Sequence, residues 1–119
     1  MVVHEPTVET RPDGSIYVVP QELDLGRGAP DQPKSQRIWL VNGSTQARRI
    51  TSAKASCGCT VVNGFEPTTL GPGESLMLEV SMTAPSRVGA ENFKHVTFQI
   101  DGQAPLKLPV RLEAVRPAT

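Results

Sequence analysis

The stretch LMLEVSM, residues 76–82, decides the fold of this chain. Leu76, Leu78, Val80 and Met82 occupy every second position, and the residues between them are mostly polar. A period of two is the pattern of a β-strand with one face buried, because successive side chains point to opposite faces. We therefore expect a strand here, with the even-numbered side chains in the core.

Similar short apolar stretches recur on both sides of this strand, at residues 16–19, 23–25, 36–41, 48–54, 60–62, 93–100 and 106–113. The 11 prolines and 10 glycines fall largely between them, and Asn42-Gly43 resembles a turn that uses positive φ. Residues 26–33 read as a polar loop. The pattern predicts an all-β, immunoglobulin-like, two-sheet antiparallel sandwich of about seven strands. Pro109 cannot donate to a ladder, which predicts that the last strand lies at an edge or has a bulge there.

A chain of 119 residues is long enough for one ordinary domain. We expect an extended lead-in over residues 1–14, a single immunoglobulin-like domain over 15–115 and a tail over 116–119. The 12 basic residues are balanced by 12 acidic ones, so a nucleic-acid partner is not expected. No apolar run approaches the roughly 20 residues of a transmembrane segment, and this chain shows no signal peptide.

Cys57-Gly58-Cys59 contains both cysteines of the chain. In an extended strand their Cα atoms would lie ~6.5 Å apart, near the upper limit for a disulfide, and a bend at Gly58 would shorten that gap. Closing so small a loop contributes only roughly 1.6 kcal/mol, which makes a disulfide here more plausible as a labile bond than as a structural one. Thiol redox chemistry is a second alternative, with Lys54 close in sequence. A third reading is that both cysteines simply pack a tight bend.

A metal site is a fourth alternative for the same pair. Structural zinc needs four ligands, and two thiolates supply only half of them. Cuprous ion is softer and accepts fewer ligands, so Cys57 and Cys59 are a candidate copper site, with Met77 or His95 as further ligands if the fold brings them near. Otherwise we expect no cofactor.

Trp39 is the only tryptophan, and strand alternation places it on the face opposite Ile38 and Leu40. It is either covered by the lead-in or part of a patch that binds a partner. No nucleophile–base arrangement, catalytic carboxylate pair or phosphate-binding glycine loop can be named, so we do not expect an enzyme.

Four elements then carry a family resemblance: LDLG at 23–26, IWLVN at 38–42, SCGCT at 56–60 and LGPGES at 70–75. In this order and spacing the sequence resembles the bacterial "domain of unknown function 1573" family, whose immunoglobulin-like domains are distantly similar to those of the ASPM–SPD-2–hydin and major-sperm-protein type. The resemblance implies an exported bacterial protein, periplasmic or secreted, with no established activity.

Two functions follow as hypotheses. The favoured one is a non-catalytic structural or protein-interaction module that contacts another protein, or neighbouring domains of a longer chain, through a sheet face or an exposed edge strand. The alternative is a copper-binding or thiol-redox protein that uses Cys57 and Cys59.

Overall fold

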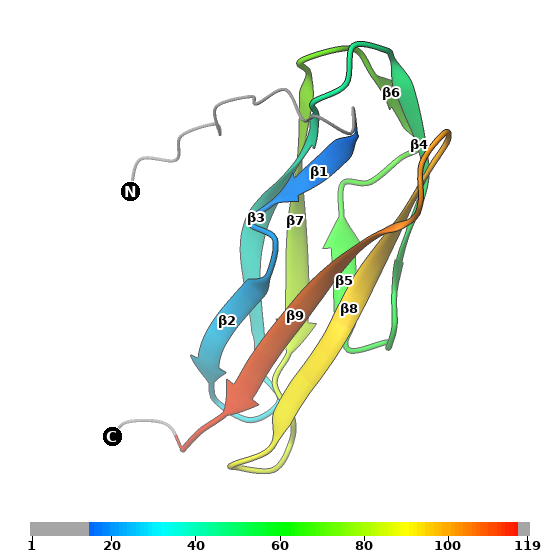
Figure 1. The fold of residues 1–119 in the computed structure, drawn as a ribbon. Coiled ribbons are helices and arrows are strands. Elements are labelled where there is room, and N and C mark those ends of the chain that lie inside the picture. The colour runs from blue at the N-terminus through cyan, green and yellow to red at the C-terminus, as the bar shows by residue number, and fades with distance from the viewer. Residues whose placement is uncertain (1–14, 117–119) are drawn as a thin grey trace.

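The computed structural model describes residues 15–116, which form two β-sheets packed face to face (Figure 1). The expected all-β, immunoglobulin-like sandwich is thereby confirmed. Nine strands occur among the described residues: β1 (Ile16–Val19), β2 (Leu23–Gly28), β3 (Pro33–Asn42), β4 (Arg48–Ala55), β5 (Thr60–Asn63), β6 (Thr68–Leu70), β7 (Ser75–Thr83), β8 (Glu91–Ile100) and β9 (Leu106–Ala114).

One sheet has four strands in the order β1-β3-β7-β5, and the other has five in the order β2-β9-β8-β4-β6. Every pair is antiparallel except β2 and β9, which run parallel. The parallel pair arises at the step from β1 to β2. The chain crosses there from one sheet to the other without a hairpin, so β2 keeps its direction and meets β9 running the same way (Figure 1).

The core lies between the sheets and follows the alternation seen in the sequence. In β7, Leu78, Val80 and Met82 are buried, whereas Met77 and Glu79 are exposed. The facing layer has the same period and contributes Val96, Phe98, Ile100, Leu108, Val110 and Leu112. Each such side chain contributes roughly 1.5–3 kcal/mol by leaving water, so the period-two pattern is enough to select this two-layer arrangement.

The strand count and two loop boundaries differ from expectation. Thr68–Leu70 forms the short strand β6, where no strand was predicted, because three residues are too few to show a period. The predicted loop at 26–33 is also shorter, since β2 continues to Gly28 and β3 already begins at Pro33. The continuation of β2 was not predicted because a bulge interrupts its regular alternation. At the bulge, Gly26 has φ 77° and its N–H donates to Asp24 Oδ1 at 2.8 Å. The pairing of β2 with β9 shifts between Asp24 and Arg27.

Pro109 does not place its strand at an edge, because β9 lies between β2 and β8. The prediction was wrong for the strand, and the ladder shows why the proline is tolerated. The N–H of Val115 bonds to Gly28 in β2, so the odd-numbered residues of β9 direct their backbone groups towards β2. Pairing with β2 begins only at Val110, opposite Leu23, so the missing N–H of Pro109 lies just beyond the end of that ladder.

Asn42-Gly43 is not a positive-φ turn, since neither residue has a positive φ. Asn42 instead is completely buried at the end of β3. Its Nδ2 donates to the carbonyls of Gln46 and Leu70, both at 2.9 Å, and its Oδ1 accepts from the N–H of Ser44 at 2.9 Å. The side chain, rather than the backbone conformation, is what the fold requires here.

The predicted lead-in over residues 1–14 lies outside the described residues, as does the predicted tail over 116–119 apart from Arg116. Within residues 15–116, no helix is long and apolar enough to cross a membrane.

Candidate functional site

The Cys57-Gly58-Cys59 turn lies where the chain crosses from one sheet to the other. It joins the end of β4, in the five-stranded sheet, to the start of β5, in the four-stranded sheet. In Figure 1 this turn is the green connection at the lower end of β5. The two cysteines are therefore held between the layers rather than within one regular strand.

Backbone hydrogen bonds attach this turn to both sheets. On one side, the N–H of Ser56 donates to the carbonyl of His95 at 2.9 Å, and the N–H of His95 donates to Ser56 Oγ at 3.0 Å. On the other side, the N–H of Thr83 donates to the carbonyl of Cys59 at 2.9 Å. The turn itself is closed by a bond of 3.3 Å from the N–H of Thr60 to the carbonyl of Cys57.

Cys57 and Cys59 are joined by a disulfide, with their Cα atoms 5.4 Å apart. This separation falls well within the range that a disulfide spans, because the segment bends instead of running as an extended strand. Gly58 is exposed and does not have a positive φ. The bend therefore does not depend on glycine's access to left-handed conformations.

Two donors lie near the sulfurs. The N–H of Cys59 points to Cys57 Sγ at 3.2 Å. Thr60, which is buried, places its Oγ1 at 3.6 Å from Cys59 Sγ and 3.9 Å from Cys57 Sγ. Sequence reasoning did not single out Thr60, although its place in the SCGCT element was a usable signal.

The structure does not gather the proposed copper ligands around one point. His95 is exposed on β8 and meets the turn through its backbone. Met77 lies six residues before Thr83 on β7, or about 20 Å along the strand from the cysteine turn. Within residues 15–116, no group of three or more His, Cys, Asp or Glu side chains could hold a metal ion. Copper binding by the reduced cysteines stays a prediction.

Trp39 belongs to a row of side chains that crosses the outward face of the four-stranded sheet. It lies opposite Val19 of β1 on one side and opposite Met77 of β7 on the other. Val19 and Trp39 are half-buried, and Met77 is 51% exposed. The predicted cover of Trp39 by residues 1–14 lies outside the described residues.

This row ends at a part of β7 that has a strand on one side only. β5 pairs with β7 from Glu79 to Met82 and extends no further, and Figure 1 shows it beside the lower part of β7. Thr83 directs its N–H towards the β5 side, so the other odd-numbered residues of β7 do the same. The backbone groups of Ser75 and Met77 therefore face a side on which no described strand pairs with them.

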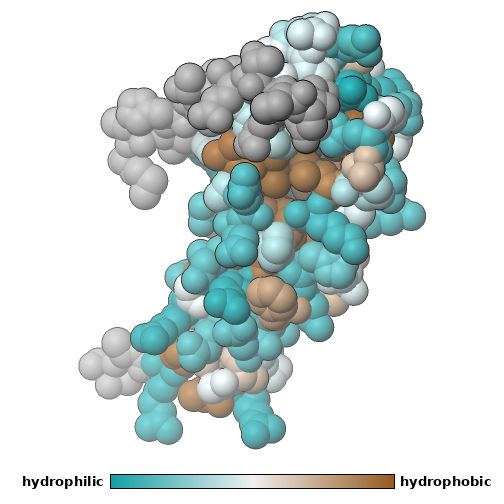
Figure 2. Space-filling view, in the orientation of Figure 1, coloured by the Kyte–Doolittle hydropathy of each residue, from teal (hydrophilic) through white to brown (hydrophobic). Residues whose placement is uncertain are grey.

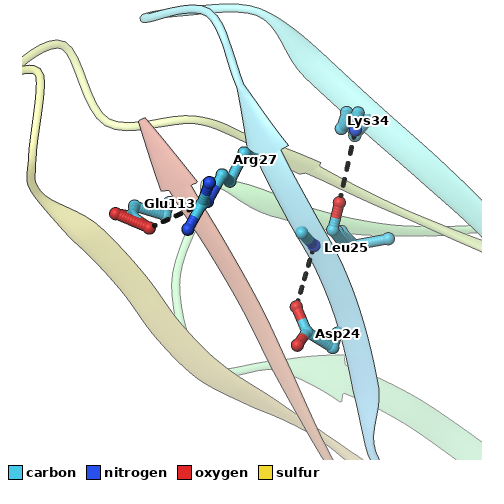
Figure 3. A network of polar contacts seen from close by, with 6 residues as sticks. Asp24, Leu25, Arg27, Lys34 and Glu113 are labelled. Carbon is cyan, nitrogen blue, oxygen red and sulfur yellow. Dashed lines mark hydrogen bonds and ion pairs between the residues drawn. The ribbon is translucent and has the colours of Figure 1, made fainter. Parts of the chain in front are cut away.

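A second uncovered edge lies on the opposite side of the same sheet, at residues 33–37 of β3, beyond the end of β1. Figure 3 shows polar contacts that residues of β2, β3 and β9 make near this edge. Lys34 Nζ donates to the carbonyl of Leu25 in β2 at 3.4 Å, and Arg27 of β2 pairs with Glu113 of β9 at 3.6 Å. Such charges and a proline at the strand start are devices that discourage further strand pairing.

Comparisons with known proteins agree with this architecture. The family described as "Protein of unknown function (DUF1573)" matches residues 16–114. None of the curated proteins matches the chain.

Solved structures with the same fold come from distant proteins. The ASH / PapD-like domain 7 of human CEP192 superposes with a TM-score of 0.66 at 10% identity, over 99% of this chain and 98% of that one. A protein of unknown function from Porphyromonas gingivalis W83 gives 0.68 at 18% identity, over 92% of this chain and 49% of that one.

A chain from the CsuC-CsuE chaperone-tip adhesion subunit pre-assembly complex of Acinetobacter baumannii gives a TM-score of 0.63 at 11% identity, over 84% of this chain and 57% of that one. This chain thus spans about half the length of these two bacterial chains. At such identities the likeness establishes the fold alone. The expected distant similarity to ASPM–SPD-2–hydin and major-sperm-protein domains is confirmed at that level.

Proposed function

The chain belongs to the family of proteins of unknown function DUF1573, and from that premise we propose that it is a non-catalytic protein-interaction module. Its partner is a protein that supplies an extended segment, which pairs with the uncovered part of β7. The observation that carries this proposal is the apolar row of Val19, Trp39 and Met77. The row ends on β7, where no described strand pairs with the backbone groups of Ser75 and Met77.

Strand addition at this position satisfies two needs at once. The N–H and C=O groups of Ser75 and Met77 gain hydrogen-bond partners, which is how added strands acquire affinity. The exposed side chain of Met77 gains a neighbour across the new pair, at the Cβ separation of about 4.5–5.5 Å that cross-strand pairs adopt. A partner residue opposite Met77 should therefore be apolar.

The other surfaces are less suited to this role. The free edge of β3 carries Pro33, Lys34 and Arg37, which oppose pairing. Figure 2 shows a largely hydrophilic surface over β2, β8 and β9, with apolar colour gathered mainly close to β1. The uncovered part of β7 carries Ser75, Leu76 and Met77, with no proline or charge. This difference from the free edge of β3 favours β7 as the docking element.

The likeness to the A. baumannii chaperone–adhesin complex supports an interaction role, because that protein is named for its assembly with another. It does not identify a partner for this chain. The partner is defined here by its chemistry, as a segment of alternating apolar and polar residues that can extend along β7.

The test uses linear peptides displayed on phage, selected against the whole chain and then measured as synthetic peptides. Selected peptides should alternate apolar with polar residues, and Met77→Lys should weaken their binding about threefold to fivefold, since a charge would replace an apolar cross-strand contact. Val88→Lys is the matched control, because Val88 is also 51% exposed but lies outside β7. Binding that both substitutions reduce equally, or that neither reduces, would overturn the proposal.

A second measurement reads the backbone directly. Amide hydrogen exchange of Ser75 and Met77 should slow when a selected peptide binds, while the amides at positions 35 and 37 of β3 should be unaffected. If the peptide instead slowed exchange of the β3 amides, it would dock at the edge of β3, and the proposed docking at β7 would be wrong.

We further propose that the protein is exported by a bacterium. A disulfide between Cys57 and Cys59 persists in an oxidising compartment, and the family resemblance implies the same location. Thiol trapping in the cells that make the protein provides the test. Fully reduced cysteines in protein fractionating with the cytoplasm would refute export.

A further inference from the structure

We propose that the Cys57–Cys59 disulfide is a site of thiol–disulfide exchange, at which an external thiolate attacks Cys59 Sγ and Cys57 is the leaving group. This activity is separate from docking at β7, because the turn lies near Thr83, at the far end of that strand from Met77. Three features support this inference: the exposure of the turn to an incoming thiol, the hydrogen-bond donors around each sulfur, and the backbone hydrogen bonds that hold the turn in place.

Access comes from the exposed side of the turn. Cys57 and Cys59 are each partly exposed, and Gly58 between them is exposed. A Cβ atom added at Gly58 would meet nothing within 4 Å. The residue that separates the two cysteines is thus exposed and uncrowded, and both cysteines are in part open to an incoming thiol.

The two sulfurs differ in their donors. Cys57 Sγ accepts the backbone N–H of Cys59 at 3.2 Å and also lies 3.9 Å from Thr60 Oγ1. Among the contacts of the described residues, Cys59 Sγ has Thr60 Oγ1 alone, at 3.6 Å. A hydrogen bond from an N–H strengthens as its acceptor becomes negative, so the turn stabilises a thiolate on Cys57 more than on Cys59. Exchange is faster when the departing sulfur is the better-stabilised thiolate.

These donors stay in place when the disulfide opens. Ser56, Cys57 and Cys59 are held by backbone hydrogen bonds to His95, Thr60 and Thr83, none of which involves sulfur. The N–H of Cys59 thus already points at the position where negative charge develops on Cys57, and little rearrangement is needed. The same bonds keep the two thiols adjacent in the reduced protein, which favours fast closure in the reverse direction.

The chemistry balances with a thiol as reductant. A thiolate R–S⁻ forms a bond to Cys59 Sγ, the Cys57–Cys59 bond breaks, and its electron pair goes to Cys57 Sγ. A second thiolate then attacks the R sulfur of the mixed disulfide and releases Cys59 as a thiolate. In total, two thiols are oxidised to R–S–S–R, and the protein disulfide is reduced to a dithiol that takes up two protons.

The direction of attack is tested by trapping the intermediate. The oxidised protein is mixed with glutathione and quenched at short times with N-ethylmaleimide, and both cysteines are then mapped by mass spectrometry. We expect glutathione on Cys59 and maleimide on Cys57, with a rate that rises in proportion to glutathione. The reverse labelling, or equal labelling of both cysteines, would overturn the assigned direction. A rate that is independent of glutathione and equal to that of global unfolding would overturn the exchange site itself.

Single-cysteine variants test the donor asymmetry. At neutral pH, Cys57 in the C59S variant should react with maleimide about threefold faster than Cys59 in the C57S variant. One charge-assisted hydrogen bond should give Cys57 about tenfold more thiolate than Cys59. Because a stabilised thiolate is also a weaker nucleophile, the expected difference in rate is smaller, about threefold. Equal rates would contradict the proposed role of the Cys59 N–H.

The hydroxyl of Thr60 lies 3.9 Å from Cys57 Sγ and can donate to it as negative charge develops there, which would assist departure of Cys57. Thr60→Val should slow the reaction with glutathione about threefold, and Thr60→Ser should restore it, because serine keeps the donor. A purely steric role would make Thr60→Ser as slow as Thr60→Val. The exchange rate is measured without any peptide present, so the failure of docking and the failure of exchange are distinguishable.

Discussion

At the scale of single residues, Asn42 shows how much of this fold one side chain can organise. Its amide is completely buried and bonds to backbone groups of Ser44, Gln46 and Leu70. These partners belong to the turn after β3 and to the end of β6, so the amide connects the two sheets at this end of the sandwich. Buried backbone groups without a partner are costly, which makes the position intolerant of an apolar substitute.

We expect Asn42→Ala to lower the free energy of unfolding by about 2–4 kcal/mol, because buried donors and acceptors lose their partners and a small cavity forms. Urea denaturation followed by tryptophan fluorescence measures the change. Asn63→Ala is the control. The side chain of Asn63 is exposed, bonds within the described residues to Glu79 Oε1 at 3.4 Å, and should matter by less than about 0.5 kcal/mol. A similar loss for both would show that the buried amide has no special role.

At the scale of elements, β8 illustrates how a strand separates core from surface. Phe93 and Phe98 lie five positions apart on it and therefore point to opposite faces. Phe98 is fully buried, whereas Phe93 is 56% exposed and lies 5.2 Å from the guanidinium of Arg111. The same residue type thus serves two different environments within one strand.

Phe98→Ala should destabilise the protein by about 3–5 kcal/mol, since it leaves a cavity between the sheets. Phe93→Ala should cost about 1 kcal/mol or less, because it removes an exposed cation–π contact. Thermal and urea unfolding of both variants test the difference. Comparable losses of stability would contradict the assignment of Phe98 to the core and of Phe93 to the surface.

At the scale of the whole molecule, the sheets are joined by their packed inner faces and by every connection between consecutive strands from β1 to β8, each of which crosses from one sheet to the other. The disulfide lies inside one of these crossings and encloses only the turn from Cys57 to Cys59. It therefore restrains a local bend and does not tie one layer to the other. We expect its opening to leave the core unchanged, because neither cysteine belongs to the buried core cluster.

Reduction of the disulfide should lower the free energy of unfolding by no more than about 1.6 kcal/mol, the chain-entropy value for so short a loop. The measurement is urea denaturation with and without a phosphine reductant, with the C57S/C59S double variant as a second reduced state. A loss above about 3 kcal/mol in both would show that the disulfide is architectural, which would also remove the reason to regard it as exchangeable.

The sequence by itself determined the two-layer β fold and the closeness of the two cysteines. Period-two alternation is a local property, and hydrophobic burial turns it directly into a strand with an inner face. Two cysteines separated by a single residue likewise stay close whatever the rest of the chain does. These features needed no knowledge of distant contacts, and the family resemblance pointed to the same fold.

Only the tertiary structure decided which strands lie beside one another. The interior position of β9 despite Pro109, the parallel β2–β9 pair and the uncovered side of β7 at Ser75 and Met77 all depend on where other strands begin and end. The buried amide of Asn42 and the donors around Cys57 are likewise set by partners several residues or several strands away. Pairing and hydrogen bonding between distant segments produce no periodic pattern in the sequence. They can therefore be identified only from the assembled sheets.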